Sequence, residues 1–129
     1  GNCEYAIVFY RDKLPKFRND GKMIFNCMDY ERDTTTTKIH PTQKSIHVIN
    51  KLIYMFTDIG DVVIDPVAGS GVSLLAATMA GRKAYGFEIK KEFVNAFNTT
   101  FKDSVQVTLD NMIAEELKNR WKQKSIFGG

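Results

Sequence analysis

The sequence is poor in cysteine and proline, and it has no long apolar run. Its 129 residues include two cysteines, Cys3 and Cys27, too few for a disulfide framework, so we expect free thiols in a reducing cytoplasm. The longest apolar stretches are short and interrupted by Asp, Lys or Gly, so no membrane span is expected. No group of His, Cys and Asp residues has the spacing of metal ligands, and we therefore expect no metal.

The composition that remains is typical of one soluble globular domain, residues 1–129. Hydrophobic residues make up 43% and charged residues 26% of the chain, which is enough apolar material for a core. The formal net charge of +3 permits a polyanionic partner without requiring one. Between Arg11 and Lys22 there are five cations and two acids. This run is either a solvated loop or a strip that contacts phosphates.

The first half of the chain contains one predicted strand and one predicted helix. Tyr5–Tyr10 is apolar, aromatic and β-branched, which predicts a strand buried on both faces. The polar tract Thr34–Thr37 predicts a loop. A helix is predicted to begin just after Thr42 and to end at Gly60. The apolar face of this helix comprises Ile46, Ile49, Ile53 and Phe56.

From Gly60 onward, patterns typical of short buried strands alternate with patterns typical of helices. The predicted strands are Val62–Ile64, Ala84–Phe87 and Val105–Leu109. The predicted helical faces are Val72, Leu75, Ala76 and Met79; then Phe93, Phe97 and Phe101; then Ile113, Leu117 and Trp121. Asp110 is the predicted N-cap of the last helix. The order β-α-β-α-β-α predicts an α/β fold with a mostly parallel sheet and covering helices.

A glycine-rich loop, Asp65–Gly71, follows the first strand of this alternating region and reads Asp-Pro-Val-Ala-Gly-Ser-Gly. In open parallel sheets, ligands bind beyond the carboxyl ends of the strands. Glycines let the backbone take a positive φ and approach a ligand closely. The start of the following helix favours a carboxylate or a phosphate. The loop is therefore a candidate site for a nucleotide-like ligand.

Three kinds of nucleotide-binding site are considered for this loop. A phosphate-binding P-loop needs a lysine after its last glycine, and Gly71 is followed by valine. A dinucleotide site needs a third glycine where this chain has Leu74. An S-adenosylmethionine site needs an acid after the second strand, and Glu88 stands 17 residues after Gly71. A carboxylate accepts the two hydrogen bonds that a ribose diol donates. Taken alone, Glu88 is an ordinary surface acid; with the loop, it favours S-adenosylmethionine.

Three segments together resemble a known family. They are Ile39–Lys44 (Ile-His-Pro-Thr-Gln-Lys), Gly60–Gly71, and Gly81-Arg82 followed by Gly86-Phe87-Glu88. In sequence and order they resemble the β class of DNA N6-adenine and N4-cytosine methyltransferases, in which the first segment is motif X and the glycine loop is motif I. The resemblance is strong from Lys38 to Phe93. It is weaker for Glu4–Arg11, which is similar to the strand before the DNA-recognition region.

The resemblance implies a partial Rossmann-like methyltransferase fold, S-adenosylmethionine as cofactor and DNA as partner. It assigns Thr42 and Lys44 to the methionine end of the cofactor, with Lys44 pairing its carboxylate. Asp65 would lie near the cofactor amino group, and Glu88 would hold the ribose. The implied cofactor-binding residues are Thr42, Lys44, Asp65, Val67, Ala68, Gly69, Gly71 and Glu88. His40 is expected to be structural or a cap.

The same resemblance divides the chain at about residue 38. Residues 1–38 resemble the end of the catalytic and DNA-recognition part, and residues 39–129 resemble the S-adenosylmethionine-binding subdomain. Three positions depart from the family pattern: Ser45 stands for proline, Val67 for phenylalanine, and Val72-Ser73 for two threonines. The loss of the phenylalanine predicts weaker cofactor binding, because a packing surface is missing.

The catalytic motif of the family, Asp/Asn/Ser-Pro-Pro followed by an aromatic residue, is absent. The three prolines, Pro15, Pro41 and Pro66, are not adjacent. We therefore expect no catalytic residue in this chain and no activity from it alone. It would be a truncated enzyme, one part of a split enzyme, or an inactive remnant or subunit that binds cofactor or DNA.

Without a catalytic strand beside it, Val62–Ile64 forms an open edge. That edge predicts a homo-oligomer or a complementary catalytic chain as partner.

Overall fold

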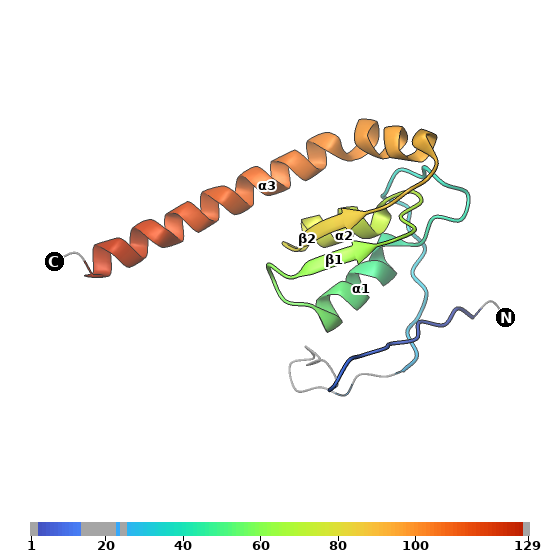
Figure 1. Cartoon of the computed structure of the whole chain (residues 1–129), viewed down its shortest axis with the longest axis horizontal. Helices are drawn as coiled ribbons and strands as arrows, with labels where there is room; N and C mark the ends of the chain where they lie inside the picture. Colours follow the sequence, from blue (N-terminus) through green and yellow to red (C-terminus); the bar gives the residue numbers. More distant parts are fainter. Residues whose placement is uncertain (1–2, 14–22, 24–25, 128–129) are drawn as a thin grey trace.

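The computed structural model of the chain describes residues 3–13, 23 and 26–127, with several side chains beyond residue 106 left out. Figure 1 shows the helices and strands in chain order. They are α1 (Ile46–Phe56), β1 (Val62–Asp65), α2 (Val72–Met79), β2 (Lys83–Gly86) and α3 (Lys91–Phe127). The described part of the chain therefore has the order α-β-α-β-α.

The strands β1 and β2 form a two-stranded parallel sheet. Val62 pairs with Lys83 at one end of the register, and Asp65 pairs with Gly86 at the other. The connection between the strands runs through α2, as parallel pairing requires. The carboxyl ends of both strands therefore lie together, and the loops that follow them, 66–71 and 87–90, are neighbours. The predicted α/β fold with parallel pairing is confirmed.

The core is built around α2, which packs against α1, α3 and both strands. Two alanines of α2, Ala76 and Ala77, are fully buried, and their small side chains let neighbouring elements approach closely. The buried hydrophobic cluster comprises Ile46, Ile53, Val72, Leu75, Ala76, Ala77, Ala80 and Phe101. Most of the apolar helical positions predicted between Ile46 and Phe101 therefore contribute to one core. Met79 is an exception, because it is 55% exposed.

Helix α1 is shorter than predicted at both ends. It begins at Ile46, whose N–H donates to Asp33 Oδ2 (3.3 Å). A turn precedes it, in which the Gln43 N–H donates to the His40 carbonyl (3.0 Å). The helix ends at Phe56, because Thr57 is extended, with φ −134° and ψ 159°. Gly60, the predicted end, lies in the turn before β1.

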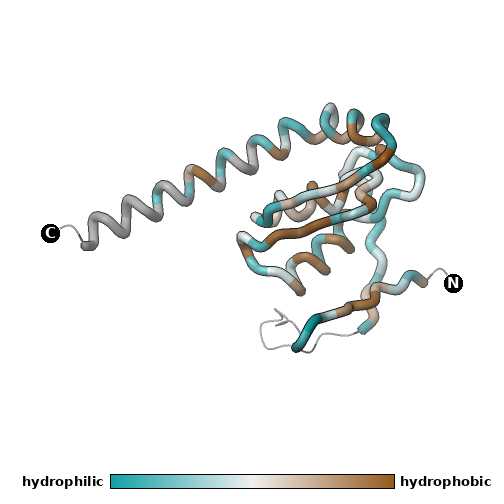
Figure 2. The backbone as a smooth tube through the Cα atoms, in the orientation of Figure 1, coloured by the Kyte–Doolittle hydropathy of each residue, from teal (hydrophilic) through white to brown (hydrophobic). Residues whose placement is uncertain are grey.

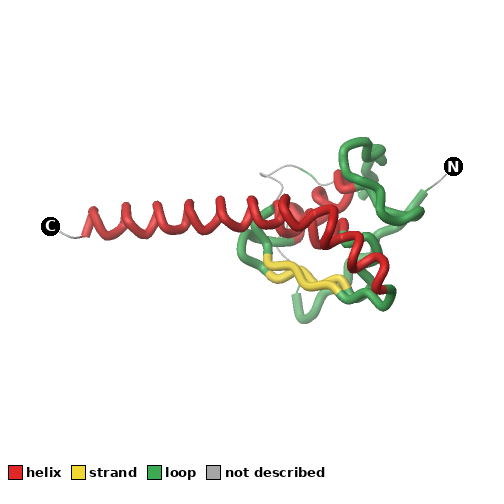
Figure 3. The backbone as a smooth tube through the Cα atoms, turned by 90° about the horizontal axis from the view of Figure 1, so that it is seen from above, coloured by secondary structure: helices red, strands yellow, loops and turns green. Residues whose placement is uncertain are grey.

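Helix α3 contradicts the prediction of a third strand and a separate last helix. Residues Val105–Leu109 belong to one helix that runs from Lys91 to Phe127, so Asp110 is not an N-cap. Alternation over five residues is too short to exclude a helix, and no glycine or proline lies between Glu88 and Phe127. Ile113 is 56% exposed rather than buried. The side chains of Leu117 and Trp121 lie outside the described part. Figures 1 and 3 show that α3 extends away from the other elements.

The predicted strand Tyr5–Tyr10 is wrong. This segment has no regular secondary structure, and Tyr5 and Phe9 are each 87% exposed. Figure 2 shows it as a partly apolar segment apart from the β1–β2 sheet. A strand needs a neighbouring strand to satisfy its backbone, and the described residues offer none beside this segment. The basic run Arg11–Lys22 lies largely outside the described residues, which end at Lys13 and resume at Met23.

Among the described elements, only α2 packs on the sheet, and it covers one face, which corrects the prediction that Val62–Ile64 is a buried strand. Val63 and Ala84 pack against the core. Side chains alternate along a strand, so the neighbouring positions point the other way. Val62, Ile64 and Tyr85 are accordingly 54%, 61% and 57% exposed. Parallel sheets normally have both faces covered, so these residues form a bare apolar face.

Candidate functional site

The loop between β1 and α2 has the backbone conformation that its glycines predicted. Gly69 and Gly71 have φ values of 54° and 73°, both in the left-handed region. The Ala68 N–H donates to the Phe87 carbonyl (2.9 Å), and the Gly71 N–H donates to the Ala68 carbonyl (2.8 Å). The loop is therefore a compact turn bound to the chain that leaves β2.

The two glycines of this loop have different surroundings. A Cβ added at Gly71 would lie 2.3 Å from Cδ2 of Phe97, so the close neighbour of Gly71 is an aromatic ring of α3. A Cβ added at Gly69 would meet nothing within 4 Å. Space for a ligand close to the backbone is therefore found at Gly69. The glycine at position 71 is required by packing.

Glu88 connects the two loops at the carboxyl ends of the strands. Its Oε2 accepts the Gly69 N–H (2.8 Å) and its Oε1 accepts the Lys90 N–H (2.8 Å). The backbone hydrogen bond from Lys90 has the largest effect and lowers the pKa of the carboxyl, whereas burial opposes it. Further hydrogen bonds from Gly69 and Ile89 keep the pKa below its usual value. Glu88 is therefore ionised at neutral pH. A carboxylate has about four acceptor positions, so it can accept further hydrogen bonds.

Asp65, the last residue of β1, holds the other side of the loop through two hydrogen bonds. Its Oδ1 accepts the Val67 N–H (3.0 Å). Its Oδ2 accepts the hydroxyl of Ser73, in the first turn of α2. One carboxylate therefore joins the end of β1, the loop and the start of α2. Sequence patterns did not single out Ser73 for this role, although it stands at a position where the family pattern has threonine.

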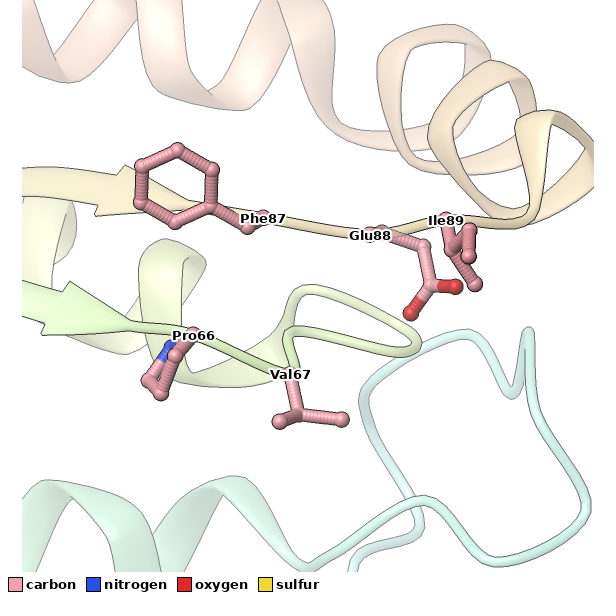
Figure 4. A pocket seen from close by; sticks show the side chains of 5 residues that line it. All are labelled: Pro66, Val67, Phe87, Glu88 and Ile89. Atoms are coloured by element: carbon pink, nitrogen blue, oxygen red, sulfur yellow. The ribbon is translucent and has the colours of Figure 1, made fainter.

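A small open cavity of about 330 Å³ lies beyond the carboxyl ends of the strands. Figure 4 shows its lining residues, with the Glu88 carboxylate directed from the chain after β2 towards the glycine loop. The lining residues are Pro66, Val67, Phe87, Glu88 and Ile89. The cavity combines one carboxylate with apolar walls. Pro66, Phe87 and Ile89 were not predicted as site residues, although Phe87 and Ile89 flank Glu88 directly.

The segment Ile39–Lys44 forms a turn held by its own side chains. His40 Nδ1 accepts the Thr42 N–H (3.1 Å) and lies 2.9 Å from Thr42 Oγ1. The His40 ring packs edge-on against Phe93, with 4.6 Å between ring centroids. Gln43 Oε1 accepts the Ile39 N–H (3.0 Å). These contacts give His40 the structural role expected for it, and they connect the turn to the start of α3.

Thr42 and Lys44 do not line the cavity beside Glu88. The Lys44 ammonium pairs with Glu4 Oε1 at 2.6 Å, in an ion pair whose side chains are 54% and 67% exposed. Lys44 therefore binds a carboxylate, as expected of its charge, but that carboxylate belongs to the chain itself. The next residue, Ser45, is buried, and its Oγ has no hydrogen-bond partner.

Within the described residues, no three His, Cys, Asp or Glu side chains are grouped closely enough to hold a metal ion. A search of the same part of the chain for a helix long and apolar enough to span a bilayer found none. Cys3 and Cys27 are free thiols, both exposed.

Comparison with known proteins gives a consistent result. Residues 7–99 match the model of a family described as DNA methylase, the N6/N4 methyltransferases. DNA adenine methyltransferase YhdJ of Escherichia coli (strain K12) is 34% identical over 92 residues, which are 69% of this chain and 31% of YhdJ. Type II methyltransferase M2.DpnII of Streptococcus pneumoniae is 33% identical over 99 residues, which are 72% of this chain and 36% of that protein.

A solved structure resembles the fold as well. The complex of M1.HpyAVI with SAM superimposes with a TM-score of 0.56 at 30% identity, covering 66% of this chain and 43% of that one. The chain spans about a third of the length of the curated relatives that it matches.

Proposed function

Because this chain belongs to the N6/N4 DNA methylase family, we propose that it forms the S-adenosylmethionine-binding part of a DNA N6-adenine or N4-cytosine methyltransferase. One observation carries the proposal: an ionised carboxylate, Glu88, lies in an apolar cavity beside the open backbone of Gly69. The cavity lies at the carboxyl ends of parallel strands, where ligands of α/β proteins bind.

The residues of the cavity fit the adenosine half of this cofactor. The free acceptor positions of Glu88 would receive the two ribose hydroxyls, in addition to the Gly69 and Lys90 N–H groups. Val67, Phe87 and Ile89, which are all exposed, offer apolar surface to a purine ring. Binding would remove this surface from water, which is favourable at about 25 cal/mol per Å².

The methionine half would lie along the glycine loop. Gly69 leaves open space beside its backbone, and the first turn of α2 presents N–H groups to a carboxylate. The Asp65 carboxylate would accept from the cofactor ammonium group in addition to Val67 and Ser73. Thr42 and Lys44 would approach the cofactor carboxylate from the Ile39–Lys44 turn. This requires Lys44 to exchange Glu4 for the cofactor, and an exposed ion pair opens at little cost.

When bound, S-adenosylmethionine supplies a methyl group on a positively charged sulfur. The work of these residues is to hold that methyl group where an exocyclic amine of adenine or cytosine can attack it in line, and such reactions depend mainly on positioning.

The chain has no adjacent prolines, so it lacks the motif that holds the target base. We propose that another segment or chain supplies this motif and that residues 39–129 form the cofactor subdomain, with residues 1–38 belonging to the catalytic part.

DNA is the proposed partner, in the cytoplasm, where the exposed thiols of Cys3 and Cys27 would stay reduced. A second proposed partner is a complementary catalytic chain or another copy, paired with the free edge of β1. Among the described residues β1 pairs only with β2, which leaves its other edge available for this pairing, and the exposed side chains of Val62 and Ile64 would add apolar contact.

Calorimetric titration with S-adenosylmethionine tests the cofactor site. Wild-type chain should release or absorb heat with a saturable isotherm, and Glu88→Ala should bind at least tenfold more weakly, roughly the effect of losing hydrogen bonds to a charged group. Lys83→Ala, which changes an exposed residue of β2 outside the cavity, is the matched control and should bind as wild type does. Equal affinities for wild type and Glu88→Ala would count against the site.

The absence of adjacent prolines favours a second candidate, a subunit that binds cofactor or DNA without catalysis. A radiolabelled methyl-transfer assay on DNA separates the candidates. The chain alone should transfer no label. Transfer should appear when a second chain carrying the family catalytic motif is added, and its continued absence would support the non-catalytic subunit. Transfer by the chain alone would contradict both.

A further inference from the structure

The glycine loop is held in shape by two side chains, one from each side. Glu88 accepts the Gly69 N–H from the β2 side (2.8 Å). Ser73 donates its hydroxyl to Asp65 Oδ2 from the α2 side. Glu88 is already expected to bind the cofactor, whereas Ser73 has no such assignment and does not line the cavity.

The start of α2 has no side-chain cap, and the Ser73 hydroxyl anchors it in another way, by donating to Asp65 rather than by accepting a backbone N–H of the first turn. The N-cap residue of α2 is Gly71, in the left-handed conformation and with no side chain to cap the helix. No capping side chain can replace it, because even a Cβ would lie 2.3 Å from Phe97. The hydroxyl of Ser73, two residues later, makes the side-chain bond that ties the first turn of α2 to β1.

The bond also determines how the Asp65 carboxylate is oriented. Its Oδ1 accepts the Val67 N–H (3.0 Å), so each carboxylate oxygen is held by one donor. The backbone of Asp65 is held too, because its carbonyl accepts the Phe87 N–H (3.0 Å). Loss of the Ser73 hydroxyl would free one oxygen and leave the carboxylate able to rotate about the remaining bond.

We propose that Ser73 is a positioning residue of the S-adenosylmethionine site, acting through Asp65 to hold the 65–71 loop in the shape that binds the cofactor. This inference rests on the proposed function. It predicts that the hydroxyl, and not the size of the side chain, is what binding requires. Threonine retains the hydroxyl and alanine removes it.

The test compares Ser73→Ala and Ser73→Thr by calorimetric titration with S-adenosylmethionine, at a temperature where every variant is folded. Ser73→Ala should bind about tenfold more weakly, which corresponds to about 1.4 kcal/mol, and Ser73→Thr should bind within about twofold of wild type. The matched control is Thr99→Ala, which removes a hydroxyl that donates within its own helix, to the Asn95 carbonyl (2.9 Å). It should bind as wild type does.

Amide hydrogen exchange of the ligand-free chain gives a second readout. The Val67 amide should exchange faster in Ser73→Ala than in wild type, and Ser73→Thr should restore the slower rate. If Ser73→Ala does not fold, Ser73→Cys takes its place, because a thiol of similar size is only a weak hydrogen-bond donor, and it should bind S-adenosylmethionine about tenfold more weakly than wild type. Equal cofactor affinities for wild type and Ser73→Ala would overturn this inference alone. Failure of the wild-type chain to bind S-adenosylmethionine would overturn the proposed function and, with it, this role for Ser73.

Discussion

At the scale of single residues, Gly69 and Gly71 show how one motif can serve two purposes. Both have a positive φ, but only Gly71 is packed against another element, through Phe97. Gly69 faces open space at the position where a ligand would approach. The sequence pattern marked both glycines for ligand approach, and the packing of α3 separates their roles.

The two glycines should therefore respond differently to alanine. Gly71→Ala should cost about 3 kcal/mol or more, because the new Cβ overlaps the Phe97 ring as well as straining the backbone. Gly69→Ala should cost about 1 kcal/mol, from the backbone alone. Urea denaturation of the two variants checks this order. A Gly71→Ala chain as stable as Gly69→Ala would contradict the packing role.

At the scale of elements, α1 depends on residues outside its own range. Asp33 accepts the N–H groups of Thr35 and Thr36, each at 2.9 Å, and the Ile46 N–H at the start of α1. Burial alone would raise the pKa of Asp33, but these hydrogen bonds, led by that from Thr36, hold it well below its usual value. The loop before α1 therefore caps the helix that Ser45 does not cap.

The stability that Asp33 provides should depend on pH. Its pKa is lower in the folded chain, so its contribution is complete above the unfolded value of 3.8 and is lost as pH falls towards the folded value. Asp33→Asn should be less stable than wild type at pH 7, by about 1 kcal/mol as for a lost cap. The difference should shrink below about pH 4. Thermal melts between pH 7 and 3 measure it, and a difference independent of pH would argue against the linkage.

Arg82 joins the ends of α1 and α2. It is 5% exposed, and its guanidinium donates to Thr57 Oγ1 (2.9 Å), to the Thr57 carbonyl (2.7 Å) and to the Ala80 carbonyl. The guanidinium carbon also lies 5.1 Å from the Tyr54 ring centroid. A positive charge at the carboxyl ends of two helices is favourable, which explains a buried cation at this position.

Replacement of Arg82 by lysine should destabilise the chain by about 2 kcal/mol, because an ammonium cannot reproduce the planar array of donors. The neighbouring Lys83→Met is the control, since Lys83 is exposed and should tolerate the change. Urea denaturation compares the two. A loss of stability in Lys83→Met as large as that in Arg82→Lys would refute the specific role of the guanidinium.

At the scale of the whole molecule, the sheet is incomplete. Its described part has two strands and one bare apolar face, and one edge of β1 has no partner strand among the described residues. Exposed edges and apolar faces promote association. The third strand predicted at Val105–Leu109 does not extend the sheet, because in the structure that segment is helical.

The chain should therefore self-associate at high concentration or bind a complementary chain through this surface. Ile64→Lys places a charge on the bare face and should shift light scattering towards monomer. Met79→Lys changes a similarly exposed apolar residue that belongs to α2 and not to the sheet, and should leave association unchanged. A wild-type chain that remains a clean monomer at high concentration would contradict this expectation.

Local patterns by themselves determined the middle of the molecule. The two strands, helix α2, and the positions of the glycine loop and Glu88 follow from apolar periodicity and turn residues, which act over a few neighbours. The strand bounds differ by one residue, because Val62–Ile64 and Ala84–Phe87 were predicted and the structure has Val62–Asp65 and Lys83–Gly86. The family resemblance also follows from these local motifs. These features could be predicted because they depend on interactions between residues that are close in the sequence.

Contacts between residues that lie far apart in the sequence could be found only from the tertiary structure. The packing of Phe97 on Gly71, the bond from Ser73 to Asp65 and the pairing of Lys44 with Glu4 join residues whose meeting no local pattern encodes. Tyr5–Tyr10 has a strand-like sequence but lies exposed, because a strand forms only where another strand offers its edge. The local sequence favours a particular helix or strand, and the element forms only where another part of the protein packs against it.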